Sequence, residues 1–169
     1  FKTKNQFIMF LFYYLALFIF VILFWLYFPI LSLLIFLMMT MIHFGLCDWS
    51  NFNIQKYKFA VSFTYGTTII FGIIFFNENE SFKIFEYLTN NRIYYFQQYF
   101  FIAYLITIFS IIYFLYLSFY EKKFRKGVIE IIFLLFIFYL FDPLLSFAIY
   151  FCFFHTYKHI KHLFKNIYL

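Results

Sequence analysis

The sequence predicts an all-α fold: a polytopic transmembrane helical bundle of about six spans, with both termini cytoplasmic. Hydrophobic residues make up 66% of the 169 residues, and the mean hydropathy is +0.88. These values lie far outside the range of soluble domains. Several apolar runs reach about 18 residues, which is enough to cross a bilayer. The length fits one domain, so we expect a single membrane-embedded domain over residues 1–169.

The boundaries of the spans come from prolines and polar segments. Pro29 separates the first two apolar runs, and a short polar link at 50–58 precedes the third. The polar loop 77–96 includes an expected short amphipathic helix around 82–88, and a basic loop occupies 121–127. We expect spans at residues 7–28, 30–47, 59–76, 98–120, 128–141 and 143–164.

The positive charges agree with an even number of spans. With six spans, every Lys and Arg except Lys83 and Arg92 falls on the same side of the membrane as the termini. The positive-inside rule places that side in the cytoplasm. The formal net charge of +6 is therefore read as a topology signal, and we expect no nucleic-acid partner.

The last expected span contains three of the four histidines of the chain. Asp142 and Pro143 form a helix-start signal, because Asp is a good N-cap and Pro fits the first helical position. His155, His159 and His162 follow at i, i+4 and i+7, so a helix places them on one face. Histidine in a membrane span usually faces the bundle interior or a functional site.

His43, in the second span, is expected at the same depth as this cluster. Counting from Pro29 and Pro143, His43 lies about 21 Å, His155 about 18 Å and His159 about 24 Å along the helix axes. An i, i+4 histidine pair with a third histidine on another helix is a metal-site pattern. Nitrogen ligands with little carboxylate favour iron, zinc or copper over calcium or magnesium.

Each of these residues also has a structural interpretation. His43 alone would be a polar residue in helix packing, and the C-terminal histidines would form a cationic face at the interface. His162 is expected at the interface, with ligation as its alternative. Asp48 is either a charge at a helix end or a hydrogen-bond partner of a ligating histidine. Glu130 could pair with a Lys or Arg of the preceding loop.

Two segments resemble the Brp/Blh family of bacterial and archaeal membrane β-carotene 15,15′-dioxygenases. Residues 43–48, HFGLCD, resemble its HFGxxD element. Residues 143–159, PLLSFAIYFCFFHTYKH, resemble its PLLxFxxYFxxxHSxxH element, and residues 66–88 resemble the intervening segment more weakly. The C-terminal element is fairly specific, whereas HFGxxD alone is a weak signal.

The resemblance implies oxidative central cleavage of β-carotene by O2 to give retinal, the chromophore of rhodopsin-type proton pumps. It implies non-haem Fe(2+) with His43, His155 and His159 as ligands. The weaker or supporting candidates are Asp48, His162, Tyr150 and Thr156. It also implies a multi-pass protein of the bacterial or archaeal cell (inner) membrane, with β-carotene, O2 and the lipid bilayer as partners.

The chain departs from the family pattern in two places. The family has a further ligand histidine in an HGxxD-like element on an N-terminal helix, whereas this chain has no histidine before His43. The simplest expectation is that this sequence lacks an N-terminal helix of the family. If it is complete, the site lacks one ligand unless His162 substitutes. Thr156 replaces the usual serine and keeps a hydroxyl.

Two other functions stay open. One is a non-enzymatic polytopic membrane protein, a carotenoid-binding or transport relative. The other is a membrane desaturase or hydroxylase, which four histidines fit poorly.

Overall fold

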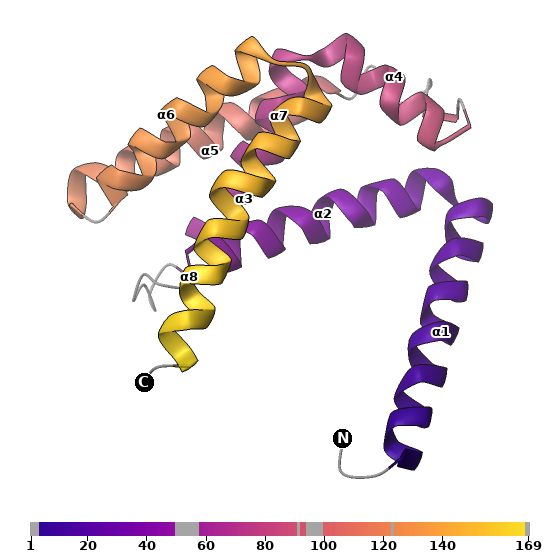
Figure 1. Cartoon of the computed structure of the whole chain (residues 1–169). Helices are drawn as coiled ribbons and strands as arrows, with labels where there is room; N and C mark the ends of the chain where they lie inside the picture. The colour runs from indigo at the N-terminus through magenta and orange to yellow at the C-terminus, as the bar shows by residue number, and fades with distance from the viewer. Residues whose placement is uncertain (1–3, 50–57, 91, 94–99, 123, 168–169) are drawn as a thin grey trace.

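The computed structural model describes residues 4–49, 58–90, 92–93, 100–122 and 124–167. Within these residues the regular elements are helices, which confirms the predicted all-α class (Figure 1). The helices are α1 (Lys4–Tyr27), α2 (Pro29–Asp48), α3 (Lys58–Phe76), α4 (Glu78–Leu88), α5 (Phe100–Tyr120), α6 (Phe124–Leu140), α7 (Pro143–Ile149), the π-helix η2 (Tyr150–His155) and α8 (Thr156–Ile167).

Three helices among the described residues are long and apolar enough to cross a membrane: α1, α2 and α3. A shorter apolar helix covers Tyr104–Tyr120 within α5. The first three expected spans therefore match helices of spanning length. Six spans and cytoplasmic termini stay predictions. The expected amphipathic helix in the loop 77–96 is confirmed as α4, although it begins earlier, at Glu78.

The fifth expected span begins earlier than predicted, because α6 starts at Phe124 inside the expected basic loop. Phe124 is fully buried, with its ring 5.6 Å from that of Trp49 and 5.9 Å from that of Phe114. The helix thus begins about one turn earlier than predicted, at a residue whose aromatic side chain is buried. The link 50–57 and the first two residues of the fourth expected span, 98–99, lie outside the described residues.

Helices α2 and α3 approach each other through two glycines. A Cβ added at Gly45 would lie 1.8 Å from the Ser62 carbonyl oxygen, and one at Gly66 would lie 1.8 Å from the Met41 carbonyl oxygen. Neither position can hold a side chain without moving a backbone. Small residues at such contacts allow close helix packing in membranes. Gly66 and Gly72 of α3 are six residues apart, which is not the GxxxG spacing. The close helix contact is instead between Gly66 and Met41 of α2.

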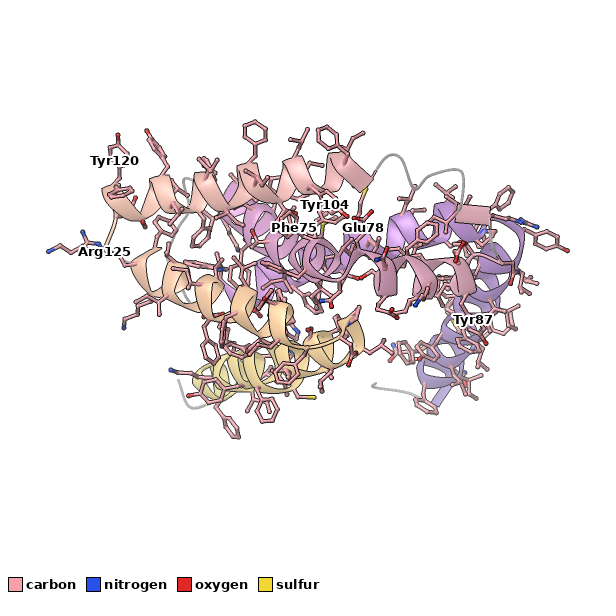
Figure 2. The ribbon with its side chains drawn as sticks, turned by 90° about the horizontal axis from the view of Figure 1, so that it is seen from above. Phe75, Glu78, Tyr87, Tyr104, Tyr120 and Arg125 are labelled. Atoms are coloured by element: carbon pink, nitrogen blue, oxygen red, sulfur yellow. The ribbon has the colours of Figure 1, made fainter. Side chains whose placement is uncertain are left out.

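Aromatic side chains join α5 to this pair of helices. Phe75 of α3 packs edge-on against Tyr104 of α5, with centroids 5.3 Å apart and Glu78 beside them (Figure 2). The side chains of α1 are largely exposed, and Trp25 Nε1 donates to the Leu88 carbonyl oxygen of α4 at 3.0 Å.

Helices α7, η2 and α8 continue one another as a single rod (Figure 1). The predicted start signal is confirmed: the Asp142 carboxylate accepts from the backbone N–H groups of Leu144 and Leu145, both at 3.0 Å. The sequence predicted one α-helix here. The structure instead has a six-residue π-helix at Tyr150–His155.

Candidate metal centre

A buried carboxylate lies where α2 meets the η2–α8 segment. Asp48, the last residue of α2, is 2% exposed. Its Oδ1 is 2.8 Å from His155 Nδ1, and its Oδ2 accepts from the Tyr150 hydroxyl at 2.9 Å. Both partners are themselves buried. A buried carboxylate is stable only when its oxygens are paired, and here both oxygens are bonded.

The π-helix explains how two residues five apart reach one carboxylate. On an α-helix, at about 100° per residue, Tyr150 and His155 would point roughly 140° apart. A π-helix bonds i to i+5 and brings such residues toward one face. Short π segments inside α-helices occur frequently at functional sites. The π-helical segment therefore brings both Tyr150 and His155 within hydrogen-bond distance of Asp48.

The three histidines singled out in the sequence are neighbours. The ring centroids of His43 and His155 are 5.4 Å apart, and those of His155 and His159 are 6.2 Å apart. His155 is buried, whereas His43 and His159 are exposed at the edge of the cluster. Phe44 packs against His155 with 4.7 Å between the ring centroids.

Imidazole is a ligand type that iron, zinc and copper share, and two ring separations in this cluster can be compared with those around one ion. Metal–nitrogen distances of about 2.1 Å would keep imidazole centroids on one ion roughly 4.5–6.5 Å apart. Both measured separations fall in this range. Hydrogen bonding of His155 Nδ1 to Asp48 is the carboxylate–histidine arrangement of many metal sites. Among the described residues, however, no three or more His, Cys, Asp and Glu side chains converge into a metal-binding group.

A second carboxylate continues the cluster on the far side of Asp48. Lys158 Nζ lies 3.6 Å from Asp48 Oδ2 and donates to Glu130 Oε1 and, at 3.2 Å, to the Tyr65 hydroxyl. Tyr65, which is fully buried, donates to the same Glu130 oxygen. Lys158 is thus the cation shared by two carboxylates from α2 and α6. Side chains of α2, α3, α6, η2 and α8 are tied together through it.

Sequence reasoning missed this extension. Lys158 was counted only as a charge on the cytoplasmic side, and no partner was predicted for it; its side chain is 20% exposed and joins this cluster. Glu130 was expected to pair with the preceding loop, but its cationic partner among the described residues is Lys158. The sequence spacing could have indicated this contact, because Lys158 follows His155 by three residues and both therefore lie on one helical face.

A family model described as Beta-carotene 15,15'-dioxygenase matches residues 2–167. The chain belongs to this family. No curated protein and no solved structure matched it.

In this β-carotene dioxygenase family member, two predicted site residues remain to be placed, Thr156 and His162. Cys47, which was not singled out from the sequence, has its Sγ 3.7 Å from His43 Nδ1. Thr156 donates its hydroxyl to the Phe151 carbonyl oxygen at 2.8 Å, which uses that hydroxyl within the helix. His162 belongs to α8, and its side chain lies outside the described part of the structure.

An apolar cavity of about 200 Å³ lies between α2, α3, α4 and α7. Thr40 and Phe147 are among the residues that line it. Thr40 precedes His43 by about one helical turn. Phe147 stacks on Phe151 and packs at a tilt against Phe44, with centroids 6.0 Å apart in both pairs. Because Phe44 and Phe151 both contact His155, the aromatic group formed by Phe44, Phe147 and Phe151 connects the cavity to the histidines.

Proposed function

We propose that this family member cleaves β-carotene at its central double bond with O2 to give two molecules of retinal. We further propose that His43, His155 and His159 hold an iron ion. The proposal depends chiefly on one observation: the buried His155 ring lies beside His43 and is bonded to Asp48 through Nδ1. Iron would supply activation of dioxygen at the site.

The residues of the chain have separable tasks in this mechanism. Asp48 accepts the Nδ1 proton of His155, so the Nε2 lone pair is left for a ligand. Tyr150 and Lys158 hold Asp48 in place and balance its charge. Phe44 and Phe151 pack on the His155 ring at centroid distances of 4.7 and 5.5 Å and limit the access of water. A fixed ring orientation lowers the reorganisation needed during reaction.

The substrate would enter from the bilayer. The apolar cavity is lined almost wholly by hydrocarbon side chains, which suit a polyene better than a polar molecule. The helices of spanning length support a site within reach of lipid-dissolved carotenoid. We place the protein in a bacterial or archaeal cell membrane as a multi-pass protein.

The test is retinal formation in β-carotene-accumulating cells that express the protein from its complete gene. His155→Ala should abolish retinal formation and preserve the carotenoid colour. Tyr157→Ala is the matched control, because Tyr157 is an exposed aromatic residue two positions away. Equal retinal formation by all three proteins would reject a role for His155. Unchanged β-carotene in cells with well-inserted unmutated protein would favour a non-enzymatic carotenoid-binding relative.

A further inference from the structure

Helix α6 and the η2–α8 segment are antiparallel neighbours. Phe133 of α6 packs against Phe154 of η2, with ring centroids 6.0 Å apart. Lys158 of α8 donates to Glu130 of α6. From the first contact to the second, the residue number falls in α6 and rises in the other segment, as in antiparallel helices. The first turn of α6 and the second half of α8 therefore lie at the same end of the helix bundle.

Exposed cations gather at this end of the bundle. Lys126 precedes Glu130 by about one turn of α6. Lys161 follows Lys158 by about one turn of α8, so both cations lie beyond the ion pair on the same side. Arg125 lies at the end of the molecule opposite to α4 (Figure 2). Four exposed cations, here called the basic end, are Lys122, Arg125, Lys126 and Lys161.

Two carboxylates near the basic end are engaged elsewhere. Glu130 and Asp48 already share Lys158. Within the described parts of the chain, no ion pair involves a cation of the basic end. Lys83 of α4, by contrast, pairs with Glu80 at 2.7 Å. The basic end therefore keeps an excess of positive charge, and its cations on α6 and α8 repel one another.

Exposed apolar side chains of α8 lie beside Lys161. They are Tyr157, Ile160, Leu163 and Phe164. At about 100° per residue they fall within one third of the helix surface, next to the face that carries the lysine. Such neighbouring faces suit the boundary of a membrane, where the stem of a lysine lies in the hydrocarbon and its ammonium group reaches the headgroups.

We propose that the basic end binds the headgroups of anionic phospholipids. The lipid phosphate lies among the cations of α6 and α8 and reduces their repulsion, while the acyl chains pack on the exposed apolar side chains of α8. The predicted topology puts this end on the cytoplasmic side, where the membrane surface is negatively charged. A lipid matches both faces of α8, whereas an acidic protein matches the cations alone. The inference goes beyond the proposed function and does not depend on the cleavage reaction.

The test measures binding of short-chain phosphatidylglycerol to the full chain in an uncharged detergent, with short-chain phosphatidylcholine as the reference lipid. The unmutated protein should bind phosphatidylglycerol more tightly, and added salt should weaken that preference. Each Lys or Arg near an anionic surface typically strengthens association roughly 5-fold. The combined variant Arg125→Gln, Lys126→Gln and Lys161→Gln should therefore bind phosphatidylglycerol roughly 100-fold more weakly. Lys83→Gln is the matched control, because Lys83 is an exposed lysine of α4, and should leave binding unchanged.

Thermal unfolding with and without phosphatidylglycerol gives a second measurement. The lipid should raise the melting temperature of the unmutated protein and of Lys83→Gln, and it should raise that of the combined variant much less. Without anionic lipid the combined variant should be at least as stable as the unmutated protein, because the substitutions remove repulsion between cations. This comparison shows that weak lipid binding does not come from a failure to fold.

Three results would overturn the proposal. One is equal binding of the two lipids by the unmutated protein, and another is unchanged phosphatidylglycerol binding in the combined variant. The third is a rise in melting temperature with inorganic phosphate that equals the rise with phosphatidylglycerol, because a free anion and not a lipid would then occupy the basic end. Retinal formation in cells is measured separately, so failure of lipid binding and failure of the cleavage reaction are distinguishable.

Discussion

Asp48→Asn is the change that most directly tests the arrangement around His155. The substitution keeps the size of the side chain, and the amide oxygen can still accept from Tyr150. The amide nitrogen, however, can only donate to His155 Nδ1, which moves the ring proton to Nε2. The nitrogen proposed to bind iron would then carry a proton.

The expected loss follows from the contacts of Asp48. Removing a hydrogen-bonded partner from a metal-ligating histidine typically lowers metal affinity 10- to 100-fold, or about 1.4–2.8 kcal/mol. Lys158, 3.6 Å from Oδ2, also loses one of its two carboxylates. It keeps Glu130, so folding should be affected less than iron binding.

The assay is anaerobic titration of purified protein with Fe(2+), paired with thermal unfolding in the same detergent. Asp142→Asn is the control, because Asp142 caps α7 on the surface and Asn is an equally good N-cap. It should leave iron affinity unchanged. Unaltered iron affinity in Asp48→Asn, with the protein still folded, would refute the role assigned to the Asp48–His155 bond.

Three further predictions follow from the packing and charge of the cluster. Gly45→Ala should destabilise the protein by about 3 kcal/mol or abolish folding, because its Cβ would overlap the α3 backbone. Gly72→Ala, whose Cβ would meet side chains at 3.2 Å or more, should cost much less; equal melting temperatures of the two variants would contradict this. Lys158→Met should destabilise by about 3 kcal/mol by leaving carboxylates without their cation, and adding Glu130→Gln should restore part of the loss. Purely additive unfolding free energies would refute the pairing. His159→Ala should lower bound iron, measured by elemental analysis, and unchanged iron content would remove it from the ligand set.

Much of the helical organisation could be predicted from the sequence. Pro29 marked the start of α2, and Asp142 with Pro143 marked the start of α7, because these signals act within one turn of chain. Apolar length identified the three helices of spanning length without knowledge of their neighbours. The shared depth of His43 and His155 followed from helical rise, and their rings do lie close together.

Other features depended on contacts between helices and could not be read from local pattern. Helix α6 starts at Phe124, whose ring packs against Trp49, a residue distant in the sequence. The choice of Lys158 as the partner of Glu130 requires α6 and α8 to be adjacent.

The sequence by itself determined the helical class, the span-length helices and the residue types gathered near the candidate site, because hydropathy and capping are local properties. Only the tertiary structure decided how those residues pair. The π-helix that points Tyr150 and His155 at one carboxylate has no local signal in the sequence. Asp48 is buried, so an oxygen left without a partner there would be costly, and both of its oxygens are bonded by residues of the π-helix.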